Sequence, residues 1–95
     1  MKIKTACIIG FGTVGKRALE ILLLKAKALG LEKVVITDIR NAETVELEVA
    51  DKVGSIIDGH GVNVAVEFDI PTMFDLYWIA LPSKRNIHDA PVEVK

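Results

Sequence analysis

The chain has 95 residues, of which 51% are hydrophobic and 26% charged, and its formal net charge at pH 7 is −1. This length is sufficient for one domain around one core. Nucleic acid is not an expected partner, because no basic excess is present to bind phosphates. Apolar runs such as residues 21–24 are far shorter than a membrane-spanning helix, and residues 1–4 lack the apolar segment of a signal peptide. The composition predicts a single domain over residues 1–95 that binds no membrane.

A glycine-rich turn follows the first apolar segment of the chain. Residues 3–9 are predicted to form a short buried strand, and Gly10, Gly12 and Gly15 then form the pattern G-x-G-x-x-G. In this pattern the first glycine allows a tight turn, the second lets the backbone approach a pyrophosphate, and the third lets a helix pack closely on the strand. The pattern alone is weak support for a ligand, because other strand-to-helix turns also use glycine.

The segments after the turn strengthen its interpretation. Apolar residues recur at helical spacing from Val14 to Leu29, and Gly30 is suited to end that helix. A second buried strand, residues 34–37, then ends in Asp38, which lies roughly 20 residues past the last glycine. An acid at this position accepts hydrogen bonds from the ribose hydroxyls of a dinucleotide. The order of strand, glycines, helix, strand and acid predicts a Rossmann-type nucleotide-binding unit.

The second half of the chain continues the alternation of helix and strand. Asn41 is predicted to cap a helix that runs to about Asp58 and carries Glu43, Glu46 and Glu48 on its solvated face. A half-covered strand near the sheet edge is expected at residues 62–68, and a single turn or loop at 69–75. A fourth strand, residues 76–81, is apolar throughout, so both of its faces are expected to be covered. The tail allows either a helical turn near residues 87–90 or a short strand at 92–94.

These elements predict an α/β fold with a three-layer, Rossmann-like and partially doubly wound parallel sheet. It has about four strands in the order 3-2-1-4. A complete sheet of this type has two further strands, so the fourth strand is expected to leave an unpaired apolar edge. Either further protein follows in a longer chain, or the chain forms a homo-oligomer through this edge.

The candidate cofactor is NAD or NADP, and its expected contacts come from the glycine turn and the strand ends: Gly10, Phe11, Gly12, Thr13, Val14, Gly15, Asp38, Arg40, Pro82 and Ser83. Thr13 can donate to a phosphate or cap the helix. Asp38 favours NAD because a carboxylate repels a 2′-phosphate, whereas Arg40 either binds that phosphate in NADP or only pairs with Asp38. Pro82 and Ser83 either border the nicotinamide or form a strand-ending turn.

The remaining reactive side chains predict neither catalysis nor a metal site. Cys7 is the one cysteine and lies within the first strand, so we expect a buried small hydrophobe and no internal disulfide. A reducing cytoplasm is consistent with this cysteine content. His60 and His88 have no partners at metal-ligand spacing and are expected at the surface.

The N-terminal part also resembles a known enzyme family. Residues 8–16, the helix through 22–27, residues 29–31 and the strand end at 37–40 resemble the N-terminal nucleotide-binding part of homoserine dehydrogenase. The resemblance covers less than half of the chain and implies NAD or NADP bound at Gly10, Gly12 and Gly15 and near Asp38 or Arg40, with Thr13 and Val14 at the phosphates. The catalytic domain of that family has no counterpart here. Residues 79–83 are similar to sugar oxidoreductases of the glucose–fructose type, but that family's Glu-Lys-Pro is absent.

The leading interpretation is therefore dinucleotide binding by a dehydrogenase-type domain, the cofactor-binding part of an oxidoreductase related to homoserine dehydrogenase. No catalytic residue is assigned, and whether the chain is an enzyme stays open. Two alternatives are a nucleotide-sensing regulatory domain, like those that gate potassium transport, and a non-catalytic Rossmann scaffold.

Overall fold

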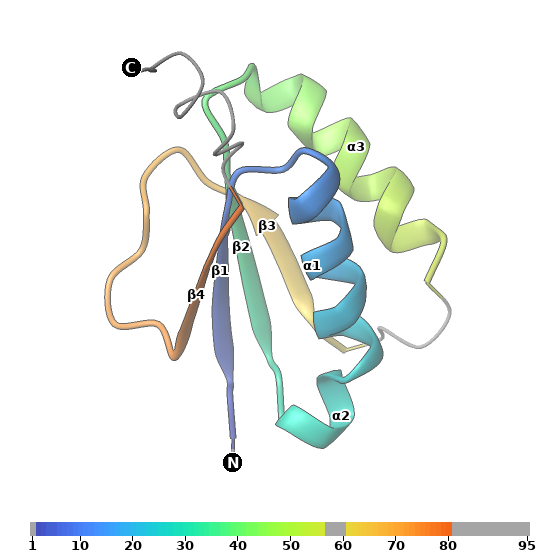
Figure 1. Cartoon of the computed structure of the whole chain (residues 1–95), viewed down its shortest axis with the longest axis vertical. Coiled ribbons are helices and arrows are strands. Elements are labelled where there is room, and N and C mark those ends of the chain that lie inside the picture. The colour runs from blue at the N-terminus through green and yellow to red at the C-terminus, as the bar shows by residue number, and fades with distance from the viewer. Residues whose placement is uncertain (1, 57–60, 81–95) are drawn as a thin grey trace, which may run out of the picture.

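The computed structural model describes residues 2–56 and 61–80, whose four strands form one sheet (Figure 1). All pairings are parallel, and the spatial order is β3-β2-β1-β4. The strands are β1 (Thr5–Ile9), β2 (Lys33–Thr37), β3 (Asn63–Val66) and β4 (Leu76–Ile79). The predicted α/β class and strand order are confirmed.

The described helices all cover one face of the sheet, while segment 67–75 lies on the other side (Figure 1). They are α1 (Thr13–Leu24), α2 (Ala26–Leu29) and α3 (Ala42–Gly54). The connections from β1 to β2 and from β2 to β3 each lead to the next strand in the same direction across the sheet. The connection from β3 to β4 returns in the opposite direction and crosses β2 and β1. Since such crossovers are right-handed, the last one has to pass over the opposite face. Segment 67–75 makes this crossing without a helix, which confirms the loop expected at residues 69–75.

The core lies between the sheet and the helices. The strands contribute alternate residues, and the helices contribute one apolar stripe each, as the periodicity predicts. Burial of one such side chain stabilises the fold by about 1.5 to 3 kcal/mol. Phe11, in the turn after β1, is completely buried within this cluster, whose other large members include Ile8, Leu19, Leu22, Leu23, Val34, Ile36 and Val45.

The first helix is interrupted, where the sequence predicts one continuous helix to Leu29. Lys25 adopts φ −103° and ψ 10°, and the short helix α2 follows it. The carbonyl of Leu29 accepts a hydrogen bond from Ile3 N at 2.9 Å, which joins the end of α2 to the segment before β1. Residues 16–29 contain neither proline nor glycine, so the local sequence does not account for the interruption. Gly30 ends α2 with φ 75°, which confirms its expected role.

The boundaries of the later elements also differ from the predictions. Asn41 caps α3 as expected, because its Oδ1 accepts from Glu43 N at 2.8 Å and from Thr44 N at 3.4 Å. The helix ends at Gly54 instead of continuing to Asp58, which lies outside the described residues. Its last turn is closed by Ser55, whose hydroxyl and N–H both donate to the carbonyl of Lys52.

Strand β3 lies at the sheet edge, as predicted, but ends at Val66. Phe68 was expected in this strand and is instead 93% exposed, because the backbone there turns toward the β3–β4 crossing. Its carbonyl accepts from Thr37 Oγ1 at 3.4 Å, so the chain leaves β3 beside the end of β2.

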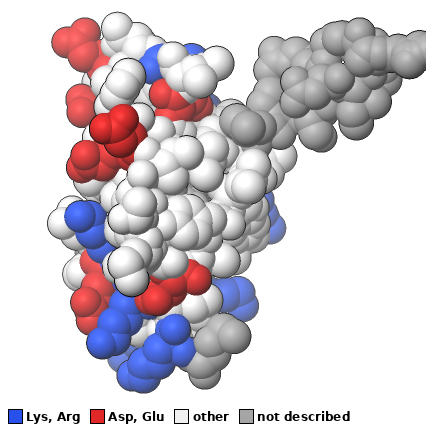
Figure 2. Space-filling view, turned by 90° about the vertical axis from the view of Figure 1, so that its left-hand side faces the viewer, with Lys and Arg blue, Asp and Glu red and all other residues white. Residues whose placement is uncertain are grey.

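Strand β4 forms the other edge of the sheet, and only one of its faces is covered within the described residues. Leu76 and Trp78 pack against the core, whereas Tyr77 and Ile79 on the opposite face are 38% and 67% exposed. Within the described residues the expectation that both faces are covered is therefore wrong, because the helices pack on the other face and segment 67–75 leaves Tyr77 and Ile79 partly exposed. Figure 2 views the side of the molecule away from the helices and shows a broad uncharged area with charged side chains around it.

Gly15 provides a test of how closely α1 packs on the turn. A Cβ added at Gly15 would lie 2.1 Å from the carbonyl oxygen of Gly10, which is backbone and cannot rotate away. We expect Gly15→Ala to lower the free energy of unfolding by about 1 to 3 kcal/mol or more, measured by urea denaturation. Gly54→Ala is the control, since nothing lies within 4 Å of its added Cβ. Equal midpoints for the two variants would contradict the packing argument.

Candidate functional site

The turn between β1 and α1 is held at the carboxyl edge of the sheet. Gly10 has φ 96°, a conformation that a side chain disfavours, and its N–H donates to Thr37 O at 2.8 Å. Gly15 is required by packing against Gly10. Backbone conformation or packing within the chain thus explains why two of the three motif positions, Gly10 and Gly15, are glycine.

Gly12 has neither reason. Its φ of −88° lies outside the left-handed region that favours glycine, its backbone is extended, and an added Cβ would meet no atom within 4 Å. The absence of a side chain at Gly12 leaves the backbone open to approach from outside. This is the position at which the motif brings the main chain close to a pyrophosphate.

The start of α1 presents unused hydrogen-bond donors. The first helical bond runs from Lys16 N to Gly12 O at 2.9 Å, so the N–H groups of Thr13, Val14 and Gly15 have no acceptor in the helix. No side chain of the described residues caps this end, and its first turn holds no acidic residue. The alternative in which Thr13 caps the helix is therefore not realised. With the positive end of the helix dipole, these donors can hold an anion.

Phe11 contributes to the site differently from the neighbouring glycines. Its side chain is buried, its N–H donates to Asp38 Oδ2 at 2.6 Å, and its carbonyl accepts from Arg40 Nη2 at 2.8 Å. Both backbone groups are engaged within the chain, so Phe11 anchors the turn instead of offering a free donor to a ligand.

Asp38 lies directly after β2 and joins the turn to the segment before α3. Its Oδ1 accepts from Arg40 N at 2.9 Å and from Arg40 Nε at 3.2 Å. Burial tends to raise the pKa of Asp38, but hydrogen bonds from the N–H groups of Arg40 and Phe11 and from the guanidinium outweigh it and lower the pKa. The side chain is only 9% exposed. Oδ2 accepts a short hydrogen bond from Phe11 N at 2.6 Å and a long one from Arg40 Nη2 at 3.5 Å, and a stronger donor could replace the long one.

Arg40 is held by a second carboxylate that the sequence pattern did not single out. Glu48 of α3 accepts from Arg40 Nη2 at 3.0 Å and Nη1 at 3.1 Å, and Lys16 Nζ lies 3.6 Å from Glu48. The hydrogen bonds that Arg40 donates to Glu48 raise the pKa of Arg40 and lower the pKa of Glu48. Glu48 was expected on the solvated face. The sequence feature that could have indicated this contact is the position of Glu48 beside Val45 and Val49, at the border of the buried stripe of α3.

A hollow of about 370 Å³ lies beside Asp38 at the carboxyl ends of β2 and β3. Its lining includes two strongly exposed apolar side chains, Ile39 at 100% and Phe68 at 93%. Exposed apolar surface beside a carboxylate is suited to a flat ring attached to a sugar.

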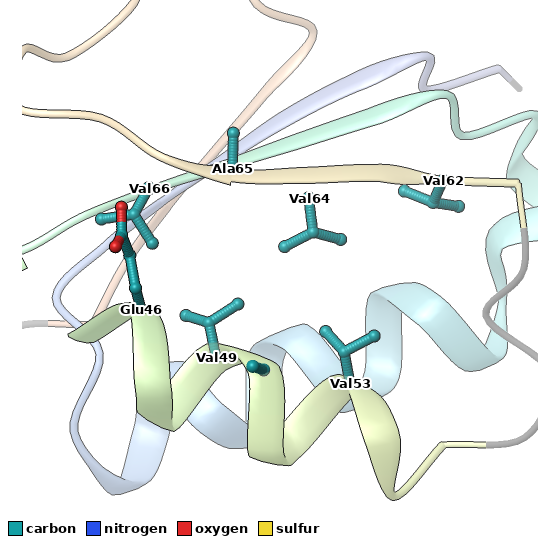
Figure 3. Close-up of a pocket in the computed structure, with 8 residues that line it drawn as sticks. Glu46, Val49, Val53, Val62, Val64, Ala65 and Val66 are labelled. Carbon is teal, nitrogen blue, oxygen red and sulfur yellow. The ribbon is translucent and has the colours of Figure 1, made fainter. Parts of the chain in front are cut away.

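A second hollow, a groove of about 530 Å³, separates α3 from β3 (Figure 3). Val49 and Val53 of α3 face Val64 and Val66 across it, and among the described lining residues Glu46 alone is charged. The described residues of the groove offer apolar contact and no set of polar groups that would orient a ligand.

Other candidate groups add no chemistry to the described part of the chain. Cys7 is buried and unbridged, as predicted, and its burial raises the pKa of the thiol. Within residues 2–56 and 61–80 no three His, Cys, Asp or Glu side chains are grouped to hold a metal. Pro82, Ser83, His60 and His88 lie outside the described residues.

Protein-family models, curated proteins and solved structures were all compared with the chain, and none matches. None of the helices in the described ranges combines the length and apolar character needed to cross a membrane.

Asp38 should make stability depend on pH in the acid range. Its folded pKa is lowered, so its contribution is complete above the ordinary carboxyl pKa of about 4 and is lost as the pH falls through the lower folded value. We expect the urea midpoint of Asp38→Asn to fall less than that of the parent chain between about pH 6 and about pH 3. Asp51→Asn, at an exposed site of α3, is the control. Identical acid slopes for Asp38→Asn and the parent would contradict this role.

Proposed function

We propose that this chain is a dinucleotide-binding module of dehydrogenase type that takes NAD or NADP at the carboxyl edge of its sheet. The observation that carries the proposal is Gly12. The fold itself requires no glycine there, yet the residue lies next to the free N–H groups at the start of α1. A pyrophosphate that approaches the backbone provides the reason that the fold lacks.

The other parts of a dinucleotide have matching surroundings. The N–H groups of Thr13 and Val14 and the exposed hydroxyl of Thr13 are placed to bind phosphate oxygens. Asp38 Oδ2 can accept from a ribose hydroxyl, and the hollow between Ile39 and Phe68 suits the adenine. Burial of these two exposed side chains against the base would add to affinity.

The role in catalysis is limited to cofactor binding. The nicotinamide of such a cofactor supplies hydride transfer when bound, and the residues of this chain bind and orient it. The resemblance of the N-terminal part to homoserine dehydrogenase supports an origin in an oxidoreductase. Pro82 and Ser83 remain the predicted neighbours of the nicotinamide, and no catalytic residue is proposed in this chain.

Gly12→Ala tests the proposal directly. The added methyl group has room within the protein but would occupy the path of the pyrophosphate, so we expect at least about a tenfold loss of NAD affinity in calorimetric titration. The urea midpoint should stay close to that of the parent chain. Gly54→Ala, remote from the turn, should leave NAD affinity unchanged.

The ligand series separates the proposal from its alternatives. Binding of NAD or NADP in preference to AMP supports a dehydrogenase origin, whereas equal binding of AMP favours a nucleotide-sensing domain. If none binds to the parent chain at millimolar concentration, the chain is a scaffold and the proposal is wrong. Unchanged NAD affinity in Gly12→Ala would also contradict the proposed pyrophosphate position.

Self-association through β4 stays a prediction. Leu76–Ile79 carries no charged residue, and Tyr77 and Ile79 are exposed at this edge of the sheet. We expect dimers in sedimentation equilibrium, and Ile79→Lys should shift the population toward monomer. A parent chain that stays monomeric at high concentration would contradict the prediction.

A further inference from the structure

We infer that Glu48 determines cofactor specificity by holding Arg40, so that the ribose subsite takes a 2′-hydroxyl and excludes a 2′-phosphate. This inference rests on the proposed function, because it concerns the same binding site. It assigns a role to a residue of α3 that lies outside the glycine motif and the end of β2.

The first support is the occupancy of the Arg40 guanidinium. Its three nitrogens make four hydrogen bonds of 3.2 Å or less: Nε to Asp38, Nη1 to Glu48, and Nη2 to both Glu48 and the carbonyl of Phe11. A guanidinium has five N–H donors, so one remains. Recognition of a phosphate by arginine uses a two-pronged fork of parallel N–H groups. In this structure the two N–H groups of that fork, on Nη1 and Nη2, already donate to the carboxylate of Glu48.

The second support is the charge around the ribose position. Asp38 and Glu48 are both carboxylates, and Arg40 with Lys16 balances them. A 2′-phosphate would bring up to two further negative charges beside these carboxylates, without a free arginine fork to receive them. A 2′-hydroxyl is neutral and can donate to Asp38 Oδ2.

These contacts decide between the two roles left open for Arg40. Asp38 and Arg40, two residues apart, are compatible with either cofactor. Glu48 makes the fork with Arg40 from a separate element, eight residues away along the chain. Arg40 would have to give up this fork before it could reach a phosphate, although 41% of its side chain is exposed.

Glu48→Gln tests the inference, because it removes the charge and keeps the shape of the side chain. We expect calorimetric titrations at constant salt to show the parent chain binding NAD at least about tenfold more tightly than NADP. Glu48→Gln should reduce this ratio by about tenfold, through tighter NADP binding. Arg40→Gln added to Glu48→Gln should abolish the gain. Glu46→Gln, which changes the net charge equally on the same helix, should keep the parent ratio.

A measurement on the parent chain alone supplements the variants. Adenosine 5′-monophosphate should bind more tightly than adenosine 2′,5′-bisphosphate, since the two probes differ only in the 2′-phosphate. Tighter binding of the bisphosphate, or an unchanged NAD to NADP ratio in a folded Glu48→Gln chain, would overturn this inference and leave the proposed function standing. Failure of every nucleotide to bind any variant would overturn both.

Discussion

The close approach of α1 to the end of β1 is the constraint on which the site depends. Gly15 lies against the carbonyl of Gly10, and the positive φ of Gly10 turns the chain from strand to helix in a short space. Phe11, completely buried, fixes this turn to the core. Any side chain at Gly15 would push the helix away and would move the free N–H groups at its start out of line with the sheet edge. The packing of one glycine thus sets the direction in which the donors point.

The polar contacts around Asp38 also hold the glycine turn in place. Asp38 and Arg40 bind the two backbone groups of Phe11, and Glu48 joins the same cluster from α3. The pair between the more exposed Arg40 and Glu48 contributes little to stability in general, whereas the nearly buried Asp38 stabilises the turn through its hydrogen bonds. The cluster connects β2, the glycine turn and α3 at the edge where a nucleotide would bind.

The handedness of the crossovers explains where that edge lies. The helices after β1 and β2 cover one face, and segment 67–75 crosses the other to reach β4 (Figure 1). The connection from β1 to β2 therefore lies on one face of the sheet, and the connection from β3 to β4 lies on the other. Strand β4 then pairs with β1. A crevice at the carboxyl ends of such a pair is where open α/β sheets bind ligands. The same topology leaves β4 at an edge with one face exposed.

Much of this arrangement follows from the sequence because its determinants are local. Strand and helix periods, the cap at Asn41, the stop at Gly30 and the order of the glycine motif each depend on neighbouring residues. The tertiary structure decided what depends on contacts between elements. The bend at Lys25 lies next to the hydrogen bond between Ile3 and Leu29, which joins distant parts of the chain. The partial exposure of β4 follows from the packing of the described helices on its other face, and the fork between Arg40 and Glu48 follows from the way α3 packs. The three glycines are equal in the sequence pattern, and only packing separates Gly10 and Gly15, which the fold requires, from Gly12, which it leaves open to a ligand.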